Sequence, residues 1–393
     1  MTEHRSPLLH RPGAVEAEGL DRGVAAHYGD PLREQRSLVR TPGTVVDLSH
    51  KGVVTVTGPD RLSWLTTLSS QVLTGLEPGR STETLFLSVQ GRIEHAPHVV
   101  DDGTSTWLIT EADETAALVA WLERMRFALR VEIEDRTGQW AVLGATGPVP
   151  GLPATVVWRD PWPHVAPGGW SYAVLDGPHP GEERTWWEHL VPRDELDALT
   201  LDLPLAGAWA AEALRIAAWR PRLGAETDER TIPHELDLLR TAVHLAKGCY
   251  KGQETVARVH NLGHPPRRLV LLDLDGSEHT LPAAGAEVVA GERTVGRVTS
   301  VQLHHEQSHR PGRAQAHRRS RRRARRHRRR AAVGRGAAGR RAAGRRAGGR
   351  PADGLPPRTP PLTSPDPGTP VTDVRPGPGA AQDRAPGGAD PQA

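Results

Sequence analysis

The stretch GVVTVTGPDRLSWLTTLSSQVLTGLEPG, residues 52–79, carries the clearest information on the fold. Residues 53–56 predict a short strand. The turn at 57–59 contains Pro59 and predicts the start of a helix, because proline is tolerated where the first backbone N–H has no partner within the helix. The helix then carries an apolar stripe at helical spacing, made of Leu62, Leu65, Leu68 and Val72. A strand followed by a helix therefore opens the first recognisable unit of the chain.

The residues that follow extend this unit. An amphipathic helix is predicted over 112–128, because apolar residues recur there every three or four positions. Stretches that are β-rich, or that alternate apolar and polar residues, predict strands at 84–89, 93–100, 107–110, 131–134 and 140–143. The resulting order β-α-β-β-α-β is the split βαβ, or ferredoxin-like, arrangement.

A second unit is expected after this one. Glycine and proline are too dense for regular elements at 145–153 and 161–181, which places a domain boundary near Gly147. Beyond it the pattern predicts a helix over 205–219 and a strand over 269–274. The sequence therefore predicts an α+β fold with at least two domains.

Charge is distributed unevenly along the chain. Residues 304–393 hold 21 Arg and 6 acidic residues, a net charge of +15, whereas residues 1–303 hold 29 basic and 41 acidic residues, a net charge of −12. The tail has almost no large apolar side chains to bury and is predicted to be disordered. Ten arginines in residues 318–330 favour sequence-independent contacts with nucleic-acid phosphates. Alternatively, the tail is an out-of-frame reading of a GC-rich gene, because Arg, Ala, Gly and Pro dominate it.

Several classes of site are not supported by the sequence. Residues 1–303 contain neither a GxxxxGK[ST] phosphate loop nor a dinucleotide-binding GxGxxG. The string HEQSH at 305–309 fits the zinc pattern HExxH, but Pro311 and Gly312 follow at once, so no buried helix and no metal site are expected there. A single cysteine excludes a disulfide framework. The N-terminus does not resemble a secretory signal and no run of about 18 apolar residues occurs, which predicts a cytoplasmic protein.

The most informative segment for function is KGCYKGQE, residues 247–254. Its two glycines permit a tight turn before an apparent helix start at Gln253. The free N–H groups of that helix start and the two lysines favour a negative charge nearby, either a ligand carboxylate or the Cys249 thiolate. The alternative is that Cys249 is a small buried hydrophobic residue, which is the usual environment of a free cysteine.

KGCYKGQE resembles the signature of the YgfZ family of folate-binding proteins, relatives of the aminomethyltransferase (T-protein) of the glycine cleavage system. The similarity extends to 214–216, 220–224, 231–235 and the downstream ETVARVHNLG, and more weakly to 52–79. The resemblance implies two α/β domains, a small C-terminal β-barrel and a central folate channel. It also implies that Cys249 is the functional thiol. The loop residues that it assigns to the folate site are Lys247, Gly248, Tyr250, Gly252, Gln253 and Glu254.

Two departures from the T-protein pattern concern folate recognition. An acidic pair is expected shortly after Gly91, but only Glu94 remains. The glutamate of the RIEAG pattern is also replaced, because this chain has Ala217 at that position. A folate site needs an apolar slot for the pterin and cationic donors for the glutamate tail. The further candidates are Arg215, Arg222, Lys247 and Arg258 for the anion and Trp219 for stacking, with surface charges and core packing as the respective alternatives.

We therefore expect an α+β protein of the YgfZ type that binds tetrahydrofolate or a derivative. The resemblance implies an accessory role in iron–sulfur cluster assembly or repair, with iron–sulfur proteins or their assembly machinery as partners and indirect support of tRNA modification. Enzymatic turnover stays open. The alternatives are a folate-dependent aminomethyl or one-carbon transferase and an RNA-binding protein acting through the arginine-rich tail.

The expected domain organisation of the chain has five parts. They are an N-terminal, partly flexible segment (1–42), the βαββαβ folate-binding domain (43–147), a second α/β domain (148–264), an incomplete C-terminal β-barrel (265–303) and the disordered tail (304–393).

Overall fold

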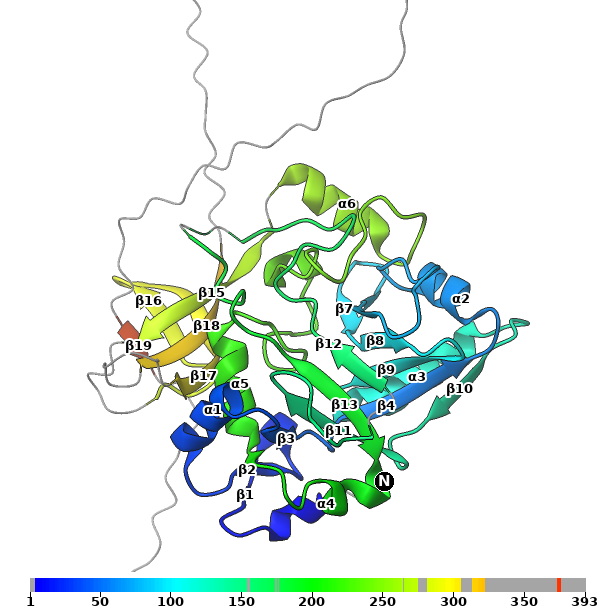
Figure 1. Ribbon diagram of the computed structural model, residues 1–393. Coiled ribbons are helices and arrows are strands. Elements are labelled where there is room, and N and C mark those ends of the chain that lie inside the picture. Colours follow the sequence, from blue (N-terminus) through cyan, green and yellow to red (C-terminus); the bar gives the residue numbers. More distant parts are fainter. Residues whose placement is uncertain are drawn as a thin grey trace, which may run out of the picture.

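The computed structural model describes residues 4–153, 156–173, 175, 177–263, 265–274, 281–304, 313–321 and 373–375. Within these ranges, three five-stranded sheets form most of the fold (Figure 1). Two of the sheets pack against each other in the centre of the molecule, and the third lies beside helix α5 (Ala208–Ala217).

The first sheet is built by the predicted βαββαβ segment. Its strands are antiparallel in the order β10-β4-β9-β8-β5. Its elements are β4 (Gly52–Thr57), α2 (Arg61–Leu68), β5 (Ser81–Glu83), β8 (His98–Asp101), β9 (Ser105–Thr110), η3 (Ala112–Glu114), α3 (Thr115–Met125) and β10 (Glu132–Asp135). The two α-helices cover one face of this sheet through buried Leu65, Leu118 and Leu122. Both predicted helices and their packing on this sheet are confirmed. Three strands of the sheet, not two, lie between the helices, and Val72 of the predicted stripe lies beyond the end of α2 and is exposed.

Two predicted strands of this segment are interrupted. The stretch 84–89 yields only β6 (Phe86–Leu87), and 93–100 divides into β7 (Ile93–His95) and β8. Pro97 separates β7 from β8, because proline has no N–H to donate to a ladder. As a result β6 and β7 form a separate two-stranded sheet.

The second sheet takes strands from both sides of Gly147. Its order is β12-β13-β11-β3-β14, and β14 runs parallel to β3. The strands are β3 (Val45–Asp47), β11 (Trp140–Ala145), β12 (Val156–Arg159), β13 (Trp187–Pro192) and β14 (Leu205–Ala206). The strand predicted at 140–143 therefore pairs in this sheet and not in the first. Periodicity indicates a buried strand there but contains no information about its partner.

The faces of the two sheets that turn toward each other form one apolar core. Val53 and Ile109 of the first sheet pack in the same cluster as Val142 and Trp158 of the second, and Ala210 of α5 closes it. Burial of each large side chain of this kind stabilises the fold by about 1.5–3 kcal/mol. The packing fixes the distance between the sheets and thus the geometry of the space between them.

The remaining elements surround this core. Residues 4–42, expected to be partly flexible, contain fully buried Leu8. These residues form η1 (Pro7–His10), β1 (Val15–Glu16), η2 (Gly19–Asp21), β2 (Ala25–His27) and α1 (Pro31–Arg40). Further along the chain lie η4 (Arg193–Glu195), α4 (Leu196–Leu199), η5 (Pro233–Leu236) and α6 (Gln253–Leu262). The helix start predicted at Gln253 is confirmed.

The third sheet follows where the C-terminal barrel was expected. It is an open antiparallel sheet in the order β15-β18-β17-β16-β19. Its strands are β15 (Arg267–Leu274), β16 (Glu287–Ala290), β17 (Arg293–His304), β18 (Arg313–Arg321) and β19 (Asp373–Arg375). Two segments of the tail assigned to disorder are thus strands, since ladder bonds come from the backbone and do not need apolar side chains. The rest of the arginine-rich tail and HEQSH at 305–309 lie outside the described residues.

Candidate functional site

A cavity lies where the two packed sheets meet α5. Its volume is about 90 Å³, enough for several water molecules. Part of the wall is apolar, with Ile93, Ile109, Trp186 and Leu236 among the lining residues. The ionisable lining residues are Asp21, Lys51, Glu83, His98, Glu111, Asp160, Arg184, Glu188, Glu212, Arg215, Arg220 and Arg222. Six carboxylates against five lysine and arginine side chains give this wall a net charge of −1 when His98 is neutral.

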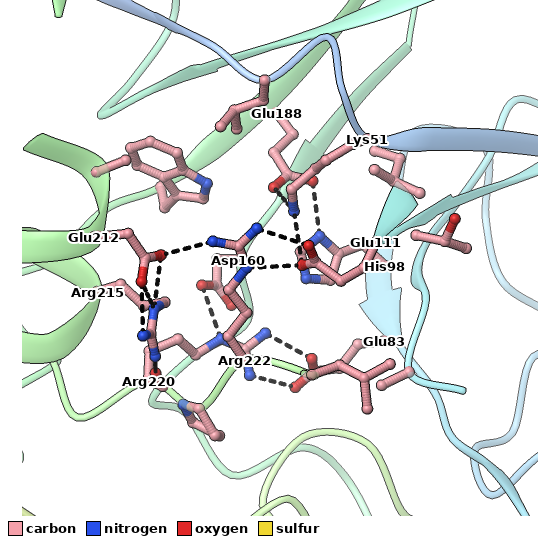
Figure 2. Close-up of a pocket in the computed structure, with 18 of the residues that line it drawn as sticks. Lys51, Glu83, His98, Glu111, Asp160, Glu188, Glu212, Arg215, Arg220 and Arg222 are labelled. Atoms are coloured by element: carbon pink, nitrogen blue, oxygen red, sulfur yellow. Dashed lines mark hydrogen bonds and ion pairs between the residues drawn. The ribbon is translucent and has the colours of Figure 1, made fainter. Parts of the chain in front are cut away.

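Arg215, expected to bind an anion, lies in this wall but is engaged by the protein (Figure 2). Its guanidinium donates to Glu212 at 2.8 Å and to Glu226 at 3.0 Å. It also donates to the Ser300 hydroxyl at 3.0 Å, which connects α5 to β17. Burial alone would disfavour its charge, but the nearby carboxylates outweigh that effect and raise the pKa of Arg215.

Arg222, the second predicted anion-binding arginine, is also part of the wall and also paired (Figure 2). It lies 2.9 Å from Asp21 and 2.7 Å from Glu111, and it donates to Glu212 at 3.2 Å. Burial raises the pKa of Glu111, but the charges of Arg222 and Lys51 outweigh burial and lower it to about 2. Glu111 is therefore ionised at neutral pH, and an anionic ligand would have to displace a carboxylate that already pairs with Arg222.

Arg220 was not a candidate from the sequence, yet it bridges two buried carboxylates of the wall. It donates to Glu83 at 2.6 Å and to Asp160 at 3.2 Å, and Figure 2 shows it between them. Its side chain is 6% exposed. The sequence signal was present in the Arg-Pro-Arg string after α5, but nothing in it separates a buried arginine from a solvated one.

Lys51, His98 and Glu188 form a second cluster that the sequence did not reveal (Figure 2). Lys51 donates to one oxygen of Glu188 at 3.0 Å, and Nδ1 of His98 lies 2.7 Å from the other oxygen. The available signal was a pair of polar residues, Glu188 and His189, inside the strand β13.

The signature loop lies outside the cavity wall. Lys247 Nζ donates to the backbone carbonyl oxygens of Thr66, of Ser69 at 2.5 Å and of Gln71 at 3.3 Å, at the C-terminal end of α2. This is the end of a helix that favours a cation. Burial lowers the pKa of Lys247 to about 8. Lys247 therefore attaches the loop to the first sheet's helix layer and does not face the cavity.

Tyr250, Gly252 and Gln253 of the loop also make contacts with the protein. Tyr250 is buried in an apolar cluster, and burial raises its pKa to about 12. Gly252 has φ +84° at the start of α6, where a Cβ atom would lie 2.5 Å from the backbone oxygen of Ser88. Gln253 donates from its side chain to the carbonyl of Lys247 at 3.2 Å. Gly248 has open space around it.

Cys249 and Glu254 are exposed. Cys249 is a free thiol at the surface, so the alternative of a buried hydrophobic cysteine is wrong. Glu254 is 87% exposed and pairs with Arg258, which is 68% exposed, at 2.9 Å. The surface-charge interpretation therefore holds for Arg258.

The last two candidates lie apart from the cavity and from each other. Glu94 pairs with Lys251 at 3.0 Å in a separate open groove. Trp219 packs with the cluster of Tyr250, and its ring stacks on His179 with centroids 5.7 Å apart. The residues predicted to form one folate site are thus distributed over a cavity, a surface loop and a groove.

The described residues contain no cluster of three or more His, Cys, Asp and Glu side chains that could hold a metal ion. None of the helices in the described part of the chain is long and apolar enough to cross a membrane.

Two packed sheets, a helix that closes a charged cavity and a C-terminal sheet define an α+β protein with a central site. Residues 13–150 match the family model of the GCVT N-terminal domain. The crystal structure of the glycine cleavage system aminomethyltransferase T from Bartonella henselae has the same fold, with a TM-score of 0.61 and 18% identity over 80% of this chain and 88% of that chain.

Similar sequences include proteins with two different kinds of role. The aminomethyltransferase of Streptomyces coelicolor is 28% identical over 334 residues, which cover 76% of this chain and 86% of that protein. An iron-sulfur cluster assembly factor IBA57 homolog, mitochondrial, from Cryptococcus neoformans is 28% identical over 263 residues, 59% of this chain and 67% of that protein. The chain is thus similar to proteins of the GcvT/YgfZ-like family, which its signature loop also resembles.

Proposed function

We propose that this chain binds a reduced folate in the central cavity and acts as an accessory protein in iron–sulfur cluster assembly or repair. The observation that carries the proposal is the separation of two features. The ionisable cavity lies between the sheets, whereas Cys249 is exposed on a loop that contributes no lining residue. A thiol that acts on a bound folate would have to reach into the cavity, but an exposed thiol can meet a partner protein.

The cavity wall suits the pterin end of a folate better than its anionic tail. Carboxylates accept hydrogen bonds from the amino group and ring N–H of a pterin, and Ile109 and Trp186 offer apolar surface to the flat ring. The wall already carries a negative net charge, so the dianionic glutamate tail belongs outside it. Glu212 lies on α5 five residues before Ala217 and lines the cavity, and we assign it the carboxylate role that Ala217 cannot perform.

The signature loop supports the partner role. Lys247 fixes the loop to the end of α2, and Gly252 permits a close approach to the turn at Ser88. Cys249 is therefore presented on an anchored loop, as a thiol that exchanges with a partner's cysteine or persulfide needs. We place this role in the cytoplasm, with tRNA modification as an indirect consequence of iron–sulfur enzyme supply.

The proposal is tested by titrating the full chain with tetrahydrofolate and following tryptophan fluorescence, since Trp186 lines the cavity. We expect saturable quenching, a Kd raised at least tenfold by Glu212→Gln, and an unchanged Kd for Cys249→Ser. In cells that lack the gene, Cys249→Ser should fail to restore iron–sulfur enzyme activity although it still binds folate. A folded wild-type chain that does not bind tetrahydrofolate would refute the folate part, and full complementation by Cys249→Ser would refute the thiol part.

A folate-dependent aminomethyl or one-carbon transferase is the second candidate. It is supported by the similarity to the aminomethyltransferase of Streptomyces coelicolor, which this chain matches over 86% of that protein's length. Turnover of tetrahydrofolate to a methylene or methyl derivative with an aminomethyl or methyl donor, at a rate that depends on Glu212, would decide for this function.

A further inference from the structure

His98 is held in the cavity wall by a carboxylate and an aromatic ring. Its Nδ1 lies 2.7 Å from Glu188, and its ring stacks on Trp158 with centroids 3.7 Å apart and an interplanar angle of 2°. Trp158 is fully buried, and its indole N–H donates to the backbone oxygen of Thr82 at 2.6 Å. The imidazole therefore has one edge and one face fixed by groups that cannot move without disturbing the core.

The protonation pattern of this pair follows from the surroundings of Glu188. Burial raises the pKa of Glu188, but the charges of His98 and Lys51 and their hydrogen bonds outweigh burial and lower it. An ionised carboxylate can only accept hydrogen bonds, so the proton between the two groups resides on Nδ1 of His98. Nε2 is then the ring nitrogen that is left to exchange a proton with a ligand.

Nε2 of His98 is available to a ligand. The side chain is 20% exposed and lines the cavity, whereas Glu188 behind it is 1% exposed. Among the described residues, the hydrogen bond of the His98 ring is the one that Nδ1 makes with Glu188, and none is made by Nε2. An imidazole oriented by a carboxylate, with its second nitrogen open toward a cavity, is the arrangement that general acids and bases use.

We infer that His98, oriented by Glu188, donates a proton from Nε2 to the ligand of the central cavity, a heterocycle with a basic ring nitrogen such as a reduced pterin. This inference rests on the proposed function for the choice of ligand. In the step, the Nε2–H bond of the imidazolium breaks and an N–H bond forms on the ligand nitrogen. The neutral imidazole keeps its Nδ1–H bond to Glu188, and Lys51 keeps Glu188 ionised.

Charged groups face His98 from several elements. Glu188 faces it from β13, and Asp160, which follows β12, interacts electrostatically with it but is itself paired with Arg184 at 2.7 Å and Arg220 at 3.2 Å. Lys51 lies before β4 but is compensated by Glu188 at 3.0 Å and Glu111 at 3.8 Å. Because a ligand nitrogen accepts from the imidazolium, binding takes up a proton, and affinity weakens as pH rises by up to about tenfold per pH unit for one proton.

The experiment is calorimetric titration of the full chain with tetrahydrofolate at pH 6 to 8, in pairs of buffers with different ionisation enthalpies. We expect the wild type to take up a fraction of a proton that falls toward zero at pH 8. His98→Gln should bind with no proton uptake and a flat pH profile. His164→Gln, at an exposed position outside the cavity, is the matched control and should behave as the wild type.

Two results of the titration overturn the inference and leave the folate proposal intact. In the first, the wild type binds tetrahydrofolate without proton uptake across this pH range. In the second, His98→Gln takes up as much proton as the wild type.

The ligand-free chain gives a second readout that does not need folate to bind. Diethyl pyrocarbonate should modify Nε2 of His98 in the native protein, and peptide mass spectrometry locates the adduct. If exposed His164 is modified and His98 is not, Nε2 is inaccessible and the inference fails, whatever the protein binds.

Discussion

The second glycine of the signature loop is needed for a backbone contact, and Gly252→Ala tests this. Gly252 has φ +84°, a conformation that costs a residue with a side chain about 1–2 kcal/mol. Its Cβ would lie 2.5 Å from the oxygen of Ser88 and 2.9 Å from Cα of Gly91, both backbone atoms that cannot rotate away. Overpacking of this kind costs a further 1–3 kcal/mol or so. We therefore expect a loss of roughly 2–5 kcal/mol in the free energy of unfolding.

Gly248→Ala in the same loop is the matched control. No atom lies within 4 Å of the Cβ position of Gly248, and its φ is not in the left-handed region. We expect a change within about 0.5 kcal/mol, or a gain of up to ~1 kcal/mol from reduced freedom of the unfolded chain. Thermal unfolding followed by tryptophan fluorescence resolves the two, since 1 kcal/mol shifts Tm by roughly 2–4 °C in domains of 150–250 residues. Equal Tm shifts for the two variants would refute the packing explanation.

Three further outcomes follow from the same contacts. Arg220→Met leaves buried Glu83 without its cation and removes one of the two arginine partners of Asp160, so it should destabilise the fold by about 3–5 kcal/mol in denaturant unfolding. Arg258→Ala at the exposed ion pair should cost less than about 0.5 kcal/mol. Burial lowers the pKa of His234 to about 4, so the folded state favours its neutral form. The free energy of unfolding should therefore be unaffected by this group above pH ~6.5 and should fall by up to about 3 kcal/mol as the pH drops toward ~4. His234→Gln should flatten that part of a curve of stability against pH. Cys249 should react stoichiometrically with a thiol reagent in the native state, because it is exposed. Cys249→Ser should change the free energy of unfolding by less than about 0.5 kcal/mol. A thiol that reacts only after unfolding would contradict the exposed position.

Local pattern was enough to place most elements of the first 150 residues. Residues 53–56 lie within β4, and the stripe that includes Leu118 and Leu122 packs on the sheet as predicted. The partner of β11 could not be predicted, because a buried strand looks the same whichever sheet it joins. Strand pairing with β3, some 95 residues earlier, depends on the tertiary fold and leaves no mark in the periodicity.

The candidate site was predicted less well, for a reason that its residues make clear. The sequence identifies the type of a charged residue but not whether its side chain is buried. Arg215 and Arg258 were therefore equal candidates for binding an anion, although Arg215 is buried among carboxylates and Arg258 is a surface charge. The family resemblance pointed to the signature loop, but it contains no information about where the loop lies relative to the cavity. Glu188 and His98 come from strands of different sheets, and their pairing exists only because those sheets pack face to face.

The concentration of paired charges around the cavity is difficult to explain by stability alone. Buried ion pairs contribute little compared with well-packed apolar side chains of similar volume, so a wall selected for stability would resemble the apolar core beside it. Here Glu212 shares both Arg215 and Arg222, and each arginine has a second carboxylate partner. Such a network can release one carboxylate to a ligand while each guanidinium keeps a counter-ion. The wall is therefore better suited to exchanging hydrogen bonds with a polar, uncharged ring than to holding a permanent anion.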